Sequence, residues 1–236
     1  MASVQKFTDK AVKNEIRHNN REIRNDRNKD IDSTRTYMNY KLSPQRDDYA
    51  YYKQRKSELY CYNRKDVKTL AGWIVTAPKE LKAEEEADFF KKTYEFLRER
   101  YGEKNVINAT VHYDEGKKEK VYNSWGEYVG ERLVLGRPHL HFLFIPVVRD
   151  GKHAQGEKIC CCKVLNRLEL QLFHGDLQAY TQCQYIKNGS TKEQGRNYTV
   201  RELKERYETE KELERLREIE KKYNREHERE RGSRWE

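Results

Sequence analysis

The run Pro138-His139-Leu140-His141-Phe142-Leu143-Phe144-Ile145-Pro146 decides how the rest of the chain is interpreted. Its period of two predicts a β-strand bounded by prolines. In such a strand His139 and His141 project from one face of the sheet. Leu140, Phe142 and Phe144 project from the opposite face and are natural core residues. Two imidazoles on one sheet face are half of a metal site, but two polar residues on the solvated side of an amphipathic strand would give the same pattern.

A second alternating segment, residues 105–113, supplies a further histidine. One side of this predicted strand and the residue after it are polar: Asn108, Thr110, His112 and Asp114. The other side carries Ile107, Ala109, Val111 and Tyr113. If this strand lies beside residues 139–141 in the sheet, three imidazoles converge. Three histidines with open positions can hold a divalent ion that polarises a phosphate oxygen, so the pattern favours a metal site.

The other periodic segments predict a mixed α+β chain. Residues 8–27 indicate a polar helix on which His18 and Arg21, three apart, share a face. An ordinary surface histidine is the alternative for His18. Strand and helix patterns follow at 70–76, 84–101 and 164–182, and the last of these is expected to cover the apolar face of the sheet.

Tyrosines gather in residues 44–68, among lysines and arginines. Such interleaving can stack on single-stranded bases, but it also fits the amphipathic face of a covering helix. Residues 116–137 are bounded by glycines and predict a hairpin that turns near 123–126.

Composition limits the size of the core. Of the 236 residues, 35% are hydrophobic and 38% are charged, which fits one domain plus an appendage. The sequence has no run of about 18 apolar residues and no apolar signal-peptide core, so we expect a cytoplasmic protein without a membrane span. Three of the five cysteines are consecutive, at 160–162. They lack Cys-x2-Cys metal spacing, and reduced thiols are expected.

Positive charge is concentrated at the N-terminal end. Residues 1–68 hold 17 Lys and Arg against 10 Asp and Glu, and residues 200–236 hold 12 of each, within a net charge of +9. The excess suggests a surface that faces phosphate. After a polar linker at 188–197, the chain from Val200 onward predicts a charged helix, either a solvated spacer or a helix for a homodimer or another partner. Its abrupt end is compatible with a longer natural protein.

Five motifs in a fixed order resemble the Mob/Pre relaxases, the plasmid mobilisation and recombination proteins of the MobV type. They are His18-Asn19-Asn20-Arg21, Asn28-Lys29-Asp30-Ile31-Asp32, Asn39-Tyr40-Lys41-Leu42, His112-Tyr113-Asp114-Glu115 and Pro138-His139-Leu140-His141. The resemblance spans roughly residues 3–180. It implies an α+β fold of the histidine–hydrophobe–histidine endonuclease type, with an antiparallel sheet, helices packed on one face and a charged C-terminal helix. We expect a relaxase domain over 1–198 and a helical extension over 199–236.

The resemblance also implies the reaction. A bacterial cytoplasmic relaxase makes a site- and strand-specific nick in supercoiled or single-stranded plasmid DNA at an origin of transfer. The enzyme stays joined to the 5′ phosphate and later reseals the strand. A partner in the transfer machinery is a further expectation.

By matching position, His112, His139 and His141 resemble the metal ligands and His18 the nucleophile. Arg21 resembles a residue that holds the scissile phosphate, and Glu115 one that orients the nucleophile or takes its proton, with Asp114 as the rival. Manganese is the expected ion and magnesium the alternative. Residues expected to support the site or contact DNA are Asn28, Asp30, Asp32, Asn39, Tyr40 and Asp114.

One departure from the family pattern separates Glu115 from Pro138. The family joins these motifs by a couple of residues, whereas 22 residues, 116–137, intervene here. A self-contained hairpin can leave the ligands in place, since long surface loops add little closure entropy. Its Lys, Tyr and Trp content suggests an arm that grips DNA, and a bare structural excursion is the alternative.

Several other functions fit part of the pattern. A rolling-circle replication initiator shares the metal motif and the chemistry. A non-catalytic single-stranded DNA-binding protein would keep the basic surface without forming an adduct. A hydrolase of small phosphoesters fits the histidines but not the basic, tyrosine-rich N-terminus. The alternative nucleophiles are Tyr37, Tyr40, Tyr51 and Tyr52.

Overall fold

A computed structural model describes residues 2–23, 30–123, 125–186, 205 and 208–221. These residues belong to two compact units. The first comprises Met1–Glu119 and Glu131–Gly189, and the second comprises Lys120–Gly130 and Ser190–Glu236. The polar linker predicted at 188–197 lies outside the described residues.

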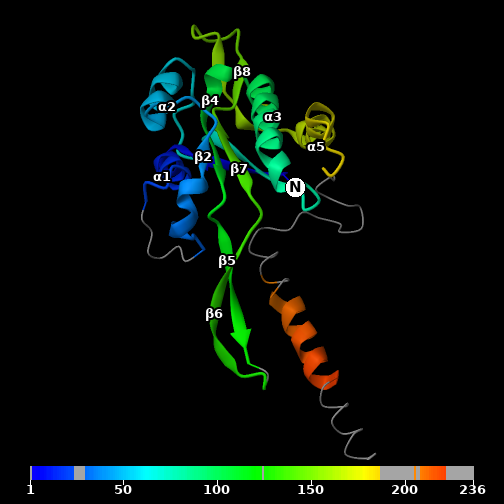
Figure 1. The fold of residues 1–236 in the computed structure, drawn as a ribbon. Helices are drawn as coiled ribbons and strands as arrows, with labels where there is room; N and C mark the ends of the chain where they lie inside the picture. Colours follow the sequence, from blue (N-terminus) through cyan, green and yellow to red (C-terminus); the bar gives the residue numbers. More distant parts are fainter. Residues whose placement is uncertain (1, 24–29, 124, 187–204, 206–207, 222–236) are drawn as a thin grey trace, which may run out of the picture. The chain divides into compact units, whose positions relative to one another are not determined.

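A five-stranded antiparallel sheet forms the centre of the first unit (Figure 1). Its strands, in spatial order, are β1 (Ala2–Thr8), β3 (Lys68–Thr76), β7 (His139–Phe144), β4 (Val106–His112) and β2 (Tyr40–Lys41). The strand predicted from the two histidines, β7, is therefore central. The other predicted histidine strand, β4, is its direct neighbour.

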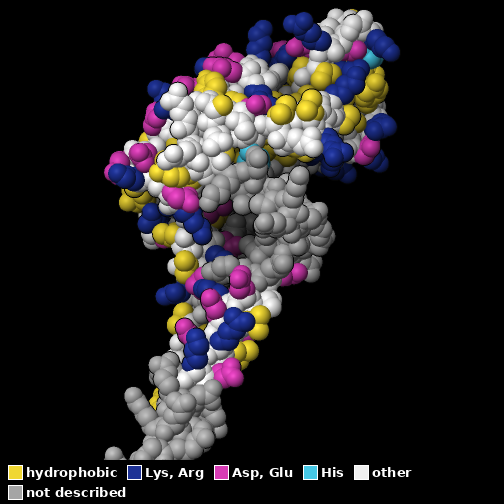
Figure 2. All heavy atoms as spheres, turned by 90° about the vertical axis from the view of Figure 1, so that its right-hand side faces the viewer, with side chains coloured by type: hydrophobic (Ala, Val, Ile, Leu, Met, Phe, Trp, Pro, Cys, Tyr) yellow, Lys and Arg dark blue, Asp and Glu magenta, His cyan; other side chains and the backbone are white. Residues whose placement is uncertain are grey.

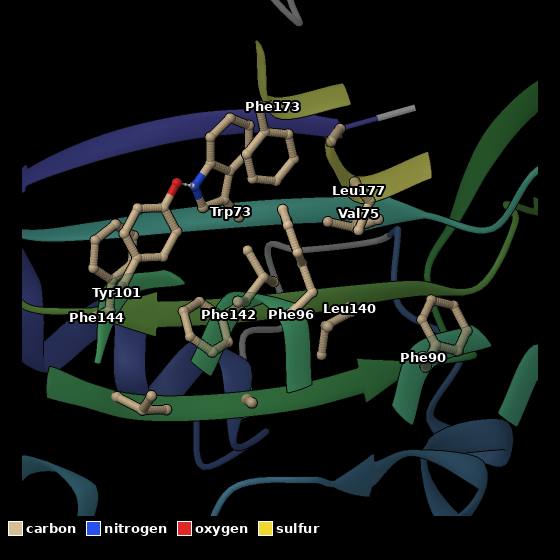
Figure 3. Close-up of a cluster of buried hydrophobic side chains, with 14 of the residues drawn as sticks. Trp73, Val75, Phe90, Phe96, Tyr101, Leu140, Phe142, Phe144, Phe173 and Leu177 are labelled. Atoms are coloured by element: carbon tan, nitrogen blue, oxygen red, sulfur yellow. Dashed lines mark hydrogen bonds between the residues drawn. The ribbon is translucent and has the colours of Figure 1, made fainter. Parts of the chain in front are cut away.

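The apolar face of the sheet packs against α3 (Ala83–Tyr101) and α5 (Arg167–Thr181). Figure 3 shows this cluster, in which the Trp73 and Phe173 rings stack with their centroids 3.5 Å apart. The indole Nε1 of Trp73 donates a hydrogen bond of 2.8 Å to the Tyr101 hydroxyl, so its polar atom is satisfied inside the core. Leu140, Phe142 and Phe144 are fully buried here, on the face predicted for them.

Helices also cover the opposite face of the sheet. There α1 (Asp9–Asn19) and α2 (Asp48–Ser57) enclose a smaller cluster that includes Val12, Ile16, Tyr52, Leu70 and Leu143. The sequence led us to expect helices on one face, and the structure adds this second layer. Part of the tyrosine-rich segment is thus a covering helix, the alternative that the sequence left open.

A bulge in β4 alters the predicted alternation. The register with β7 shifts between Val106 and Asn108. Ile107 therefore joins the cluster beneath α1 and α2, whereas Ala109 and Val111 stay in the cluster beneath α3. The prediction that Ile107 shares a face with Ala109 was wrong because a bulge adds one residue to the strand and reverses the side on which the preceding residues lie.

Local sequence determines where the helices begin and end. Asp47 accepts a hydrogen bond from the Ala50 amide at the start of α2, and Asn166 does the same for the Glu169 amide at the start of α5. Gly102, with φ of 86°, closes α3 in a backbone conformation that favours glycine. The N-terminal helix is shorter than the predicted 8–27, because α1 ends at Asn19.

Short elements complete the description. They are η1 (Ser33–Met38), η2 (Glu103–Asn105), β5 (Gly116–Tyr122), β6 (Tyr128–Leu135), β8 (Val147–Arg149), β9 (Glu157–Ile159) and α4 (Cys161–Val164). The pairs β5–β6 and β8–β9 each form a two-stranded sheet. None of the helices in the described ranges is both long and apolar enough to cross a membrane.

Several apolar side chains of the helix predicted at 164–182 reach solvent. Leu168 and Leu172 on α5 are exposed, whereas Phe173 and Leu177 on the same helix are buried. Figure 2 shows hydrophobic side chains at the surface in several places, among Lys, Arg, Asp and Glu. The helical period of α5 thus buries one stripe and leaves the remaining leucines outside.

The second unit brings the hairpin turn and the C-terminal helix together. Residues 208–221 are helical, in the segment predicted to be a charged helix. Arg215 donates to the Gly126 carbonyl at 2.9 Å. Its guanidinium carbon also lies 4.1 Å from the centroid of the Tyr122 ring. Trp125, at the turn, is 86% exposed.

Candidate metal centre

The register of β4 and β7 brings three histidines to one end of the sheet. His112 lies opposite His139, and Thr110 lies opposite His141. The ring centroids of His112, His139 and His141 are 4.7 to 5.7 Å apart. Glu115, three residues beyond His112, adds a carboxylate, and one potential ligand atom from each of the four residues lies within 4.8 Å of the others. The predicted convergence of imidazoles is thus present.

Backbone carbonyls fix the orientation of two of the imidazoles. His112 Nε2 lies 2.9 Å from the Asn19 carbonyl oxygen, and His139 Nδ1 lies 3.1 Å from the Arg137 carbonyl oxygen. Because a carbonyl oxygen only accepts, these two nitrogens carry the proton in the neutral rings. The lone pairs therefore reside on His112 Nδ1 and His139 Nε2, which face the carboxylate.

This arrangement fits a bound cation. Glu115 Oε1 lies 3.4 Å from His112 Nδ1, and Glu115 Oε2 lies 3.2 Å from His139 Nε2. Lone pairs of neutral imidazoles that face a carboxylate at these distances repel it unless a cation or a proton stands between them. His141 Nε2 is buried without a hydrogen-bond partner. A metal ion would satisfy that nitrogen and remove the repulsion.

Burial and the neighbouring side chains shift two pKa values at the centre strongly. Burial lowers the pKa of His141 well below its usual range, and the adjacent His112 and His139 lower it further. Burial alone would raise the pKa of Glu115, but hydrogen bonds from His112 and His139, when a proton stands between them and the carboxylate, outweigh burial and lower that pKa. A neutral His141 and an ionised Glu115 are both forms that bind metal.

His18 lies next to this centre, in the last turn of α1. Its Nε2 is 3.7 Å from Glu115 Oε1, and its ring centroid is 6.4 Å from that of His141. The side chain is 36% exposed, so a ligand from solvent can reach it. Burial and the nearby Arg21 charge lower the pKa of His18, which favours the neutral imidazole.

Arg21 does not lie on the helix that carries His18. The helix ends at Asn19, and Arg21 has a left-handed φ of 56°. The prediction of a shared helical face was therefore wrong, because Asn19 and Asn20 are poor helix formers and the chain turns there. Arg21 still meets the site through its side chain. Its Nη2 lies 2.8 Å from Glu115 Oε1, and its Nη1 donates to the His18 carbonyl at 3.1 Å.

Asp114 is the principal partner of Arg21. Arg21 Nε and Nη2 donate to its two carboxylate oxygens at 3.0 and 2.6 Å. Thr36 Oγ1 donates a further hydrogen bond of 2.9 Å. Burial would raise the pKa of Asp114, but the bonds from Arg21 lower it. Asp114 is fully buried and committed to Arg21 and Thr36, whereas Glu115 faces the imidazoles.

The segment around residues 30–40 supports the backbone that carries Asp114 and Glu115. The Asp30 carbonyl accepts from the Gly116 amide at 2.7 Å, and the Asp32 amide donates to the Asp114 carbonyl at 2.8 Å. Asn39 Oδ1 accepts from the Tyr113 amide at 2.8 Å. Tyr40 pairs with Val111 in the sheet. Asn28 lies outside the described residues.

A buried polar network beneath α1 was not predicted as part of the site. Asp48 Oδ2 accepts hydrogen bonds from Asn20 Nδ2 at 3.1 Å and from Asn108 Nδ2 at 2.9 Å. Lys41 Nζ lies 2.8 Å from both Asp48 oxygens. The polar period of β4 indicated Asn108, but nothing local in the sequence indicates that Asp48 meets it. The network anchors the chain just after His18 and Asn19.

Comparison with known proteins identifies the family of this chain. The family model Mob_Pre, described as plasmid recombination enzyme, matches residues 1–211. The chain belongs to the Mob_Pre family. Its resemblance to the Mob/Pre relaxases, inferred from five motifs, is confirmed.

The Mob_Pre relatives are bacterial plasmid recombination enzymes. A type 1 enzyme from Staphylococcus aureus is 34% identical over 154 residues, which are 61% of this chain and 33% of the relative. A relative from Streptococcus agalactiae is 26% identical over 216 residues, which are 86% of this chain and 38% of the relative. The chain thus spans between about a third and two fifths of the length of these two proteins.

A solved Mob_Pre structure has the same fold. The MobM relaxase domain, in a Mn-bound crystal structure with plasmid pMV158 oriT DNA at pH 6.8, is 26% identical, with a TM-score of 0.64. The match covers 87% of this chain and 97% of that domain. The predicted α+β fold with an antiparallel sheet is therefore confirmed.

Proposed function

We propose that this chain is a metal-dependent DNA relaxase that nicks one strand of plasmid DNA at an origin of transfer and later reseals it, for plasmid mobilisation. One observation carries the proposal: a half-exposed histidine, His18, stands beside a buried cluster of three histidines and a glutamate. Membership of the Mob_Pre family and the Mn-bound, oriT-bound MobM domain support the same reaction.

His18 is the proposed nucleophile. Its neutral imidazole nitrogen attacks the scissile phosphorus, the phosphorus–O3′ bond breaks, and the departing 3′ oxygen takes up a proton. The enzyme is then joined to the 5′ phosphate through a phosphoramidate. A returning 3′-hydroxyl displaces the imidazole and gives its proton to solvent or a neighbouring base. One phosphodiester bond is exchanged for one phosphoramidate bond and later re-formed from it, so resealing requires no nucleotide cofactor.

Glu115 and Arg21 are proposed to prepare this step. Glu115 lies within 4 Å of His18 and can orient the imidazole or take its proton, whereas Asp114 is occupied by Arg21. Arg21 has five N–H donors, and four contacts to Asp114, Glu115 and the His18 carbonyl leave little for a phosphate. Arg21 therefore supports the phosphate mainly through its charge and by positioning both acidic groups.

His112, His139 and His141 are proposed to hold a divalent metal, with the Glu115 carboxylate as a further donor. Such an ion, when bound, acts as a Lewis acid on a phosphate oxygen. Manganese is the preferred choice because three imidazoles favour a transition metal and magnesium binds nitrogen poorly. The Mn-bound MobM structures agree with this choice.

The inserted segment 116–137 is proposed to contact DNA. It begins directly after Glu115, so DNA that reaches the metal centre passes the root of the insertion. An exposed tryptophan at the turn, Trp125, can stack on a base. Asn123 Oδ1 accepts hydrogen bonds from the Trp125 and Glu127 amides at 3.0 and 2.9 Å, which hold the turn in shape.

The tyrosine alternatives have less support. The Tyr52 hydroxyl is buried between Asp9 and Thr69, and the Tyr51 hydroxyl donates to the Lys104 carbonyl. Burial raises the pKa of Tyr40, which works against forming the phenolate nucleophile. Tyr37 is 84% exposed rather than buried, and it is therefore the tyrosine to test as an alternative nucleophile. A replication initiator remains the second candidate, because it would use the same chemistry at a different DNA site.

A cleavage assay tests the proposal. The chain is incubated with Mn²⁺ and supercoiled plasmid or single-stranded oriT DNA, and nicking and the 5′-linked adduct are measured. His18→Ala should abolish both, whereas Tyr37→Phe, the matched control, should leave them intact. Undiminished cleavage by His18→Ala would refute the nucleophile. DNA binding without any nick or adduct in the unaltered chain would favour the non-catalytic alternative.

A further inference from the structure

Two of the three consecutive cysteines have their sulfur atoms in contact. Cys160 Sγ and Cys162 Sγ are 3.6 Å apart. Cys162 is exposed and Cys160 is half-buried. The bond in a disulfide is about 2.05 Å, so these are two separate thiols held at the distance from which a bond can form. Neither residue has a role in the fold core or in the metal centre.

The backbone holds this pair in place. The Cys160 amide donates to the Pro146 carbonyl at 2.8 Å, and the Cys160 carbonyl accepts from the Lys163 and Val164 amides, each at 3.2 Å. Cys160 therefore follows directly after strand β9 and is the N-cap residue of the short helix α4. These backbone bonds hold Cys160 at the start of α4, and Cys162 lies in the first turn of that helix, so the local structure keeps the two thiols near each other.

The remaining cysteines differ from this pair. Cys161 and Cys183 are buried at 8% and 9% exposure and belong to the hydrophobic cluster beneath α3 and α5. Cys61 is half-buried, and its Sγ faces the Tyr62 carbonyl at 3.7 Å. All five cysteines lie in the described part of the chain, and the contact between Cys160 and Cys162 sets these two apart.

We propose that Cys160 and Cys162 form a redox-active dithiol that a low-molecular-weight disulfide converts reversibly to an intrachain disulfide. The exposed Cys162 thiolate attacks one sulfur of the small disulfide, whose bond breaks to release one small thiol. Cys160 Sγ then attacks the Cys162 sulfur, its proton passes to the second small thiol, and that thiol leaves. Two protein thiols are oxidised while one small disulfide is reduced to two thiols.

The resulting bond is expected to be labile. It would close a loop of only three residues, which constrains the unfolded chain very little. Exposed or strained disulfides are the ones most readily reduced. Cys162 is the exposed thiol and Cys160 the half-buried one, whose pKa burial raises, so the exchange begins at Cys162. The site thus suits a reversible modification rather than a structural cross-link.

Mass spectrometry of the full chain after exposure to oxidised glutathione tests the proposal. The unaltered protein should lose two alkylatable thiols, become lighter by two hydrogen atoms and carry no glutathione at this pair. Dithiothreitol should restore both thiols. Cys160→Ser should instead accumulate glutathione on Cys162, because the second attack is missing.

The controls decide between an intrachain bond and general thiol reactivity. Cys61→Ser should form the 160–162 disulfide as readily as the unaltered protein, and peptide mapping should locate it. Glutathione that persists on Cys162 in the unaltered chain would overturn the proposal. So would a pair that stays reduced while Cys61 reacts. Far-ultraviolet circular dichroism of each serine variant verifies that the fold is retained.

Discussion

The two faces of the central sheet are built by the same strands and serve different purposes. On the side of α3 and α5, β7 presents Leu140, Phe142 and Phe144, all fully buried. On the side of α1, the same strand presents His139 and His141 to the metal centre. Alternate residues of β7 therefore either pack in the hydrophobic core or face the metal centre.

This division explains how a polar cluster is held in a small protein. The histidines require fixed positions, and they receive them from a strand whose opposite side is locked by aromatic packing. Carbonyl groups of Asn19 and Arg137 then fix the two ring orientations. Substitutions at neighbouring positions should consequently separate stability from activity.

The largest effect is expected from the apolar face. Phe142→Ala removes a fully buried ring and should lower the free energy of unfolding by about 3–5 kcal/mol. Urea denaturation measures this loss. Nicking by the fraction that remains folded should persist, because the histidines are untouched. A stable variant without activity would show that the two faces are not separable.

The matched change on the polar face is His139→Ala. It should reduce metal-dependent nicking by about 100-fold or more and weaken Mn²⁺ binding, with only a small change in stability. Most of the DNA affinity should remain, since phosphate contacts come from elsewhere. Calorimetric titration with Mn²⁺ and a filter-binding assay measure the two quantities.

A chelator provides the control for this change. EDTA should stop nicking by the unaltered chain, and added Mn²⁺ should restore it. Equal Mn²⁺ affinity in His139→Ala and the unaltered chain would remove this histidine from the ligand set.

A smaller effect is expected from the buried network behind α1. Asn20→Ala removes the hydrogen bond to Asp48 and one to Asn108, and should cost about 1–3 kcal/mol of stability. Because these bonds anchor the end of α1, the cleavage rate should fall by about 10-fold with little change in DNA affinity. The exposed partner of Asn20, Glu22, offers the control. If Glu22→Gln slows cleavage equally, the buried bonds are not the cause.

The smallest effect is expected from the hairpin. Deleting 117–135 should weaken DNA binding, and Trp125→Ala should account for about 1 kcal/mol or more of the loss if one base stacks on it. Fluorescence anisotropy with labelled oriT DNA measures both. Unchanged affinity in the deletion variant would reduce the hairpin to a structural excursion.

Much of the metal centre could be predicted from local patterns. The period of two in β4 and β7 indicated which histidines share a face, and the pairing of the strands brought them together. The position of Arg21 could not be predicted in the same way. Its left-handed backbone and its bonds to Asp114 depend on a contact across 93 residues of sequence.

Long-range pairing also explains the elements that the sequence did not indicate. The strand β1 has only a weak alternation, and its identity comes from antiparallel pairing with β3. The short pair β8–β9 likewise exists through pairing alone. In α5, the apolar period indicated a helix, but which leucines become buried depended on where α3 lies.

The hydrogen bond from the Gly136 amide to the Glu115 carbonyl, 2.9 Å long, closes the root of the inserted hairpin. A side chain at position 136 would meet that carbonyl at 3.2 Å, so the approach suits glycine. This bond joins the two ends of the inserted segment directly beside Glu115. Because the ends of the hairpin are joined there, we expect a hairpin of different length to leave the positions of Glu115 and His139 unchanged.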